Sequence, residues 1–380
     1  KRYAAASDAG TSTFYFDAGN VLYSKLRPYL NKVAIPDETG IATTELIPLR
    51  PDPKILNPRF LAHYLRSPGF VNQASHHVAG AKMPRVVMDW FWEHEAPIPS
   101  SKEQSRIVEL LDQADRLRRI RREADAKAAR ILPALFLKMF GDPATNSAGW
   151  PVSTIGDLAT LVTSGSTPRG GAEVYVTEGP YIIRSQNVLM NYLRLSDAAR
   201  ITTETHQQMS RTWVQEGDVL LNITGASIGR VAWVKVLDGP ANVNQHVCIV
   251  RPNPALIDPA FLSACLSLPS MQTVINDIQT GASRQALNHV QVRGLRVPVP
   301  PVRIQAKFSE QAKILEECVE QSDMARESLD RLWATMMQRA FSGLLTAQWR
   351  EAHMEELLVE MAEQARVLNF QVSKELEALS

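Results

Sequence analysis

Two long stretches of the chain carry apolar residues at steps of three and four. In residues 103–140 these positions run from Ile107 to Leu135, and in the second stretch they run from Phe308 to Met336. This spacing puts the apolar side chains on one face of a helix, and Pro133 is the only helix breaker in the first stretch. The pattern predicts two helices of about 36 residues, each about 54 Å long, which pair in antiparallel fashion.

Short apolar clusters occupy the segments ahead of each predicted helix. Val219-Leu220-Leu221 and Val247-Cys248-Ile249-Val250 are bounded by Gly, Pro and Asn, as strands are. Residues 259–268 form a helical pattern with Pro259 in the first turn. These segments predict mixed α/β (α+β) domains.

The chain also repeats itself. Arg50-Pro51-Asp52-Pro53 recurs 201 residues later as Arg251-Pro252-Asn253-Pro254, and the same offset joins Phe140 to Phe341. Upstream the offset is 198, since Gly19-Asn20-Val21-Leu22 matches Gly217-Asp218-Val219-Leu220. One three-residue insertion explains the change. The repeat predicts two tandem domains, each followed by a long helix.

The repeat sets the expected domain boundaries. The second domain opens at Trp150 and reaches Gly217 after 67 residues, whereas the first reaches Gly19 after 18, so about 50 residues are expected to be missing ahead of Lys1. The expected parts are a first domain (1–100), a helix with linker (101–149), a second domain (150–301), a second helix (302–345) and an acidic amphipathic extension (346–380). The extension either lengthens the helical part or contacts a partner.

Composition and charge exclude several classes of protein. The net charge of +1 does not by itself indicate a nucleic-acid partner. No run of 18 apolar residues is present to span a membrane. The three cysteines and the histidines show no ligand spacing, which predicts no metal site and a reduced, cytoplasmic protein.

No catalytic constellation is visible. The chain lacks a GxxxxGK[ST] loop for ATP, a defensible nuclease pattern and an Asn-Pro-Pro-Tyr-type methyltransferase motif. Asn253-Pro254 belongs to a Pro-flanked turn whose copy is Asp52-Pro53, so it is interpreted as structural.

Polar loops that differ between the two copies are the candidates for DNA contact, because Arg, Lys, Gln, Ser and Thr side chains can bond to base edges or phosphates. The candidate DNA-binding residues are Lys25, Arg27, Lys82, Arg85, Ser164, Ser166, Thr167, Arg169, Thr224, Ser227, Arg230, Ser283, Arg284 and Gln285. Lys25 and Arg27 are candidates for phosphate contact, whereas Arg284 and Gln285 suit guanine and adenine. The alternative is that these loops are ordinary solvated turns.

Arginines crowd the first predicted helix at positions 116, 118, 119, 121 and 122. They could lie along a DNA backbone. The second helix offers Glu316, Glu317, Glu320, Asp323 and Glu327, so pairing between the helices is the alternative interpretation.

Several motifs, in order, resemble type I restriction–modification specificity subunits. They are Trp150-Pro151 with Ile155-Gly156-Asp157, Ser164-Gly165-Ser166-Thr167-Pro168, Glu216-Gly217-Asp218, Thr224 to Gly229, Asn244-Gln245-His246-Val247, Thr280-Gly281-Ala282-Ser283, and Pro298 to Pro301 before Gln305. The first copy departs from the pattern by losing the double proline, and the second by carrying Ile304 before Gln305.

The resemblance implies two target recognition domains, held apart by antiparallel helices about a pseudo-two-fold axis, that read the two halves of an asymmetric double-stranded DNA site. It also implies a non-catalytic chain that binds two methyltransferase subunits and joins restriction/translocase subunits. The chain would bind no cofactor itself, since S-adenosylmethionine, ATP and Mg²⁺ would be used by the partner subunits.

Two other functions stay open from sequence alone. The chain could be a coiled-coil oligomerisation scaffold with protein-binding domains, which a salt-dependent DNA shift assay would distinguish. It could also be a nuclease or methyltransferase in its own right, which incubation with DNA, Mg²⁺ and S-adenosylmethionine would reveal.

Overall fold

The computed structural model describes residues 13–168, 171–279 and 286–368. The chain divides into two compact units: unit 1 comprises residues 1–123 and 323–380, and unit 2 comprises residues 124–322. The divisions fall inside the two longest helices, α4 (Ser101–Ala128) and α11 (Val302–Phe341). None of the helices in the described ranges has the length and apolarity needed to cross a membrane.

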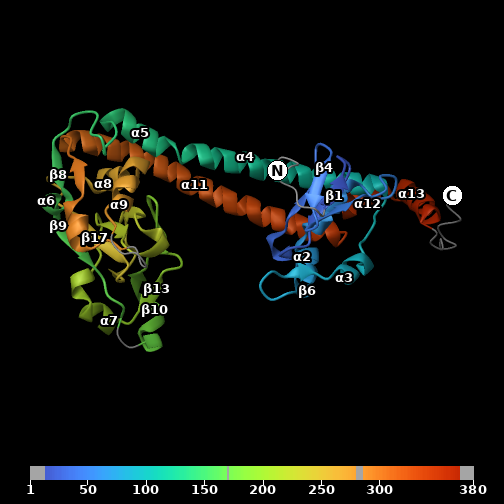
Figure 1. Ribbon diagram of the computed structural model, residues 1–380, viewed down its shortest axis with the longest axis horizontal. Helices are drawn as coiled ribbons and strands as arrows, with labels where there is room; N and C mark the ends of the chain where they lie inside the picture. Colours follow the sequence, from blue (N-terminus) through green and yellow to red (C-terminus); the bar gives the residue numbers. More distant parts are fainter. Residues whose placement is uncertain (1–12, 169–170, 280–285, 369–380) are drawn as a thin grey trace. The chain divides into compact units, whose positions relative to one another are not determined.

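Unit 1 is built on a small antiparallel sheet in the order β3-β2-β5, with two further strand pairs, β1-β4 and β6-β7. Figure 1 shows strands β1, β4 and β6 of this unit in blue. Tyr23 on β2 stacks on Phe91 and meets the edge of Phe70, which anchors two helices on the sheet. The strands are β1 (Thr13–Phe16), β2 (Val21–Ser24), β3 (Val33–Ala34), β4 (Gly40–Thr43), β5 (Leu46–Leu49), β6 (Val78–Ala79) and β7 (Arg85–Val86). The short helices are η2 (Pro28–Leu30), α1 (Pro58–Leu65), α2 (Pro68–His76) and α3 (Met88–Glu93).

Unit 2 contains a four-stranded antiparallel sheet in the order β15-β14-β17-β9 and a three-stranded sheet in the order β13-β10-β16, with pairs β11-β12 and β18-β8. The strands are β8 (Val152–Thr154), β9 (Ala159–Ser164), β10 (Tyr175–Ile183), β11 (Val188–Leu189), β12 (Tyr192–Leu193), β13 (Ala199–Ile201), β14 (Val219–Asn222), β15 (Val231–Trp233), β16 (Ala241–Val243), β17 (Val247–Pro252) and β18 (Arg296–Pro298). The helices are α5 (Ile131–Phe140), α6 (Ile155–Leu158), η3 (Gly171–Val174), α7 (Thr203–Gln208), η4 (Ser210–Thr212), η5 (Gly225–Ser227), α8 (Pro259–Ser267), α9 (Pro269–Asp277) and α10 (His289–Gly294).

The predicted local elements of the second domain are confirmed. Both apolar clusters are buried strands, β14 and β17, which pair with each other. The predicted helix is α8, with Pro259 in its first turn and Asp258 accepting the Phe261 N–H as an N-cap. Phe136, Phe140, Phe261 and Phe308 pack their rings together in the core that these elements share with α5 and α11.

The internal repeat is visible as matched hydrogen bonds in the two units. Gln104, fully buried in unit 1, accepts the Asn57 N–H at 2.8 Å and donates to the Ile55 and Pro99 carbonyls. Gln305, fully buried in unit 2, accepts the Asp258 N–H at 2.8 Å and donates to the Leu256 and Pro300 carbonyls. Every partner in the second set lies 201 residues after its counterpart. The chain therefore holds two tandem copies of one α/β domain.

The two long helices run antiparallel in each unit. In unit 1, Arg118 of α4 bonds to Asp330 of α11, and in unit 2 the Ser322 hydroxyl donates to Asp125 at 2.8 Å. The expected continuous helix over 103–140 is wrong, because residues 129 and 130 form a turn between α4 and α5. Pro133 explains the break: it has no N–H, and its ring clashes with the carbonyl four residues earlier.

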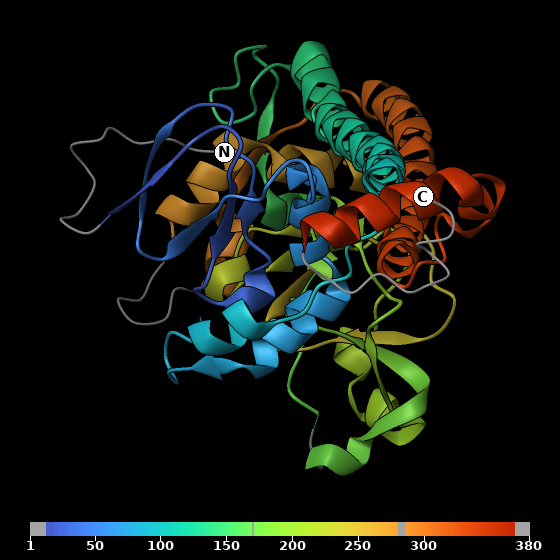
Figure 2. The same ribbon diagram turned by 90° about the vertical axis from the view of Figure 1, so that its right-hand side faces the viewer.

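The C-terminal extension folds back on unit 1 as α12 (Ala347–Ala352) and α13 (Met354–Val367). Figure 2 shows these two helices in red beside the start of α4. The buried Glu103 of α4 accepts from the Thr346 hydroxyl at 2.6 Å and from Arg350 at 3.0 Å. In unit 2 the position of Glu103 is taken by Ile304, which cannot make these bonds. The contacts of Glu103 with the C-terminal extension thus explain why the first copy carries Glu103 before Gln104.

Candidate nucleic-acid interface

Four segments of unit 2 come together where the strands of its four-stranded sheet end. Ser164, the last residue of β9, bonds to the His289 ring at 2.9 Å, although 125 residues separate them. The Thr167 hydroxyl donates to Gln245 at 2.8 Å, and Thr224 bonds to the His246 ring. The predicted residues Ser164, Thr167 and Thr224 therefore belong to one polar loop cluster.

Backbone contacts fix this cluster tightly. A Cβ on Gly165 would lie 1.7 Å from the Val243 carbonyl oxygen, so only glycine lets the β9 loop approach the β16–β17 turn this closely. Gly225 takes a left-handed φ of 72° in the β14–β15 turn. The turn is joined to the segment that begins at Ala286, since Thr224 pairs with Ala286 and the Leu287 N–H donates to the Ile223 carbonyl.

Three other predicted residues of unit 2 belong to its described part. Ser166 and Arg230 are exposed, and Ser227 accepts the Arg230 N–H through its carbonyl. Arg169, Ser283, Arg284 and Gln285 lie outside the described residues.

Sequence reasoning missed Gln245, His246 and His289, the partners that connect the cluster. Gln245 also contacts the His246 ring, with 3.1 Å between Nε2 atoms. A sequence signal for two of them exists, because residues 244–247 form one of the motifs that resemble those of specificity subunits.

The same backbone positions form a cluster in unit 1. Leu26 pairs with Arg85 as Thr224 pairs with Ala286, and the Val86 N–H donates to the Lys25 carbonyl. The Lys25 N–H donates to the Glu45 carbonyl at 3.0 Å, as Ile223 does to His246. Arg27, at the position of Gly225, also has a left-handed φ, 53°. The scaffold is thus repeated while the side chains on it change.

Side chains in the unit 1 cluster are strongly charged. Arg85 forms an ion pair with Glu45, with 2.8 Å between Nη2 and Oε1. This hydrogen bond holds the pKa of the Glu45 carboxyl below its ordinary value. Lys82 is exposed in the β6–β7 loop. The predicted residues Lys25, Arg27 and Arg85 therefore lie together, with Glu45 as a partner that the sequence did not reveal.

Three arginines of α4 in unit 1 lie in two different environments. Arg118 pairs with Asp330 and lies 5.0 Å from the centre of the Trp333 ring, which supports the interhelical interpretation with a partner other than the predicted acids. Arg116 and Arg119 instead line a groove of about 710 Å³ together with Arg59 and Arg66.

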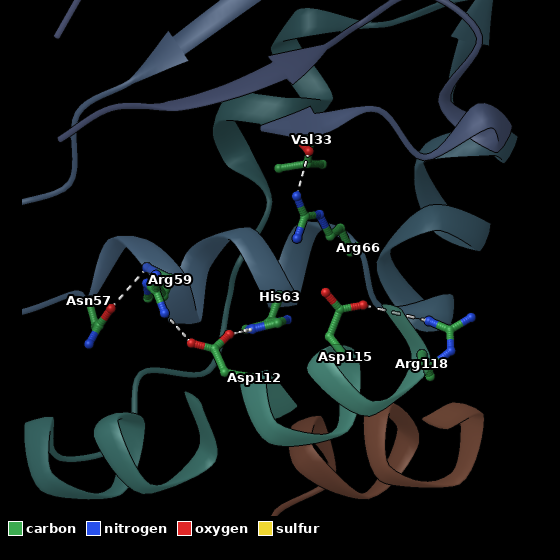
Figure 3. Close-up of polar contacts among 8 residues, drawn as sticks. All are labelled: Val33, Asn57, Arg59, His63, Arg66, Asp112, Asp115 and Arg118. Carbon is green, nitrogen blue, oxygen red and sulfur yellow. Dashed lines mark hydrogen bonds and ion pairs between the residues drawn. The ribbon is translucent and has the colours of Figure 1, made fainter. Parts of the chain in front are cut away.

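Figure 3 shows the polar contacts beside this groove. Asp112 of α4 pairs with both Arg59 and His63 of α1, and Arg66 donates to the Val33 carbonyl at 2.6 Å. In unit 2 the matching carbonyl, Val231, accepts the Asn191 N–H of the β11–β12 hairpin. The matching surface of unit 2 is therefore covered by protein, which argues against the groove as part of a DNA-binding face common to both copies.

His63 makes the stability of unit 1 depend on pH. Burial lowers its pKa and outweighs the bond to Asp112, which raises it. Its Nδ1 is buried without a hydrogen-bond partner among the described residues, so the neutral ring is favoured. The unfolded chain titrates near 6.5. The contribution of the neutral His63 ring to the stability of unit 1 is therefore fully present above that pH. It decreases as the pH falls through 6.5 toward the lower pKa that His63 has in the folded protein.

Urea denaturation at about pH 7.5 and about pH 5.5 measures this loss. The His63→Gln variant is expected to show a smaller loss than the wild type, whereas the exposed control His76→Gln keeps it. A full wild-type loss in His63→Gln would contradict the assignment.

Among the described residues, no three His, Cys, Asp or Glu side chains lie together as metal ligands would. Cys248 lies in the core, and burial raises the pKa of its thiol to about 12.

Comparison with known proteins identifies relatives of both copies. The family model described as "Type I restriction modification DNA specificity domain" matches residues 9–128 and 147–331. The Type I restriction enzyme EcoBI specificity subunit of Escherichia coli is 29% identical over 179 residues, 46% of this chain and 37% of that protein. The StySPI specificity subunit of Salmonella potsdam is 24% identical over 80% of this chain and 68% of its own length. The solved S subunit of a type I restriction-modification system from M. genitalium has a TM-score of 0.54 at 15% identity, over 86% of this chain and 83% of that chain.

Proposed function

The chain belongs to the family of type I restriction–modification DNA specificity domains, and we propose on this basis that each of its two domains reads one half of a bipartite, asymmetric DNA site. The role of this family is recognition and not catalysis. The observation that carries the proposal is the pair of matched loop clusters. Their backbone hydrogen bonds coincide, whereas one copy presents Lys25, Glu45 and Arg85 and the other presents Thr224, Gln245 and His246. Two half-sites of different sequence require this combination.

The cluster in unit 2 supplies the test of base reading. Gln245 is exposed, and its amide can bond bidentately to adenine. Gln245→Ala is expected to lower the discrimination between the preferred duplex and one altered at a single base pair by about 1–3 kcal/mol. Competition binding with two duplexes measures it.

Thr160→Ala is the matched control. Thr160 is exposed at the other end of β9, so this variant should discriminate as the wild type does. Equal weakening of Gln245→Ala on both duplexes would make Gln245 a backbone contact and remove it from base reading.

We also propose that the five parts of the chain end at residues 100, 149, 301, 345 and 380. The helical region would associate with two methyltransferase subunits and with restriction/translocase subunits. In this assembly S-adenosylmethionine, ATP and Mg²⁺ would be bound by the partners and no cofactor by this chain. Exposed apolar residues on the helices support a protein partner: in unit 1, Leu117, Ile120 and Leu332 are at least half exposed.

The methyltransferase contact has a direct test. Leu117→Glu combined with Ile120→Glu places two charges on the apolar face and is expected to abolish co-purification with a co-encoded methyltransferase. Leu256→Glu changes an exposed leucine, 41% accessible in a loop of unit 2, and should leave co-purification intact. Retention of the methyltransferase by the double variant would contradict this surface.

A further inference from the structure

The guanidinium of Arg85 is held in a fixed orientation. Its Nε donates to both carboxylate oxygens of Glu45, at 2.9 and 3.1 Å, and its Nη2 donates to one of them at 2.8 Å. Its Nη1 donates to the Met83 carbonyl at 3.3 Å. Glu45 therefore occupies one edge of the planar group and fixes its plane.

The guanidinium also keeps donors that these bonds do not use. Each Nη carries two N–H groups and makes one of these bonds, so Nη1 and Nη2 each keep one N–H group for a ligand. The Arg85 side chain is 42% exposed and can reach a ligand. A fork of two N–H donors matches the O6 and N7 acceptors of guanine in the major groove.

The matched positions in unit 2 cannot form this arrangement. Arg85 corresponds to Ala286 and Glu45 to His246, as the shared backbone bonds show. Ala286 has no donor to present, and His246 bonds to Thr224 instead of orienting a cation. The same scaffold therefore carries an ion pair, Arg85 with Glu45, in one copy, whereas Ala286 and His246 at these positions form none in the other.

We propose that Arg85 reads one guanine in the half-site of unit 1 and that Glu45 is its positioning residue. This inference rests on the proposed function. According to this inference, the two domains recognise different half-sites because unit 1 carries Glu45 and Arg85 where unit 2 carries His246 and Ala286.

Selection of bound sequences from a random DNA duplex library tests the inference with the full-length chain in its complex. Arg85→Lys keeps the charge and loses the planar fork. It is expected to reduce the preference for one guanine about 5- to 150-fold, a range typical of bidentate contacts, while every other position keeps its wild-type preference.

The Glu45→Gln variant tests whether Glu45 orients Arg85 or only adds a negative charge near the DNA. Removal of a negative charge strengthens binding to every sequence. The inference requires, in addition, a weaker preference for the same guanine, because Arg85 is no longer fixed. Arg50→Gln is the control, since Arg50 is an exposed cation of unit 1 that pairs with Asp17 outside the cluster. It should keep the guanine preference.

Three results would overturn the inference: an unchanged guanine preference in Arg85→Lys, uniform weakening at all positions, or a preference that Glu45→Gln leaves intact. If the wild type itself selects no sequence, the proposed function has failed instead, so the two failures are distinguishable.

Discussion

Insertion of four residues into both α4 and α11 is expected to widen the gap between the two half-sites by one or two base pairs. Four residues add about 6 Å of helix, just under two base pairs at about 3.4 Å each. They also make slightly more than one turn, so each apolar face rotates by only about 40°. The half-sites themselves should stay unchanged, because the recognition loops are untouched.

Two interhelical contacts decide where the insertions go. Arg118 pairs with Asp330, and Asp125 pairs with Ser322. Insertions between residues 118 and 125 of α4, and between residues 322 and 330 of α11, keep both pairs in register. The same four residues inserted at Val236, an exposed position after β15, should leave the gap unchanged. An altered half-site with the old gap would show that the helices do not set the spacing.

Asp218→Ala is expected to destabilise unit 2 by about 3–5 kcal/mol, the range for breaking a buried ion pair. Asp218 is fully buried and accepts from Arg251 at 2.7 and 2.9 Å and from the Gln215 N–H at 2.8 Å. Removal of the carboxylate leaves the Arg251 guanidinium, whose side chain is only 25% exposed, without its counterion.

The repeat provides the control for this variant. In unit 1 the position of Asp218 holds Asn20, and Arg50 pairs with Asp17 at the surface, where the side chains are 66% and 41% exposed. Asp17→Ala should therefore cost at most about 1 kcal/mol. Urea denaturation measures both variants. Equal costs would contradict the contrast between a buried and a surface pair.

The sequence predicted the tandem architecture well, because a repeat needs no knowledge of tertiary contacts. Matching Arg50 with Arg251 and Gln104 with Gln305 already placed the equivalent positions of two domains. The strands β14 and β17 and the helix α8 were predicted because their burial or capping is encoded locally. The break before Pro133 was missed because one proline can also be accommodated as a kink, and the packing decides between the two outcomes.

The site was predicted only in part. Ser164, Thr167 and Thr224 were chosen for their chemistry, but their partners Gln245, His246 and His289 come from segments up to 125 residues away. Only the fold brings such segments together. Glu45 was missed for the same reason: its carboxylate lies 40 residues before Arg85. The position of the C-terminal extension depends on contacts between residues far apart in the sequence, such as those of the buried Glu103 with Thr346 and Arg350.

Mapping the DNA sequence that the assembled complex methylates in its host tests the central claim most directly. Two domains with different side chains on one scaffold predict two short defined blocks of unlike sequence, separated by a gap of fixed length in which any base is accepted. A single continuous motif, two identical blocks, or methylation without sequence preference would contradict the account.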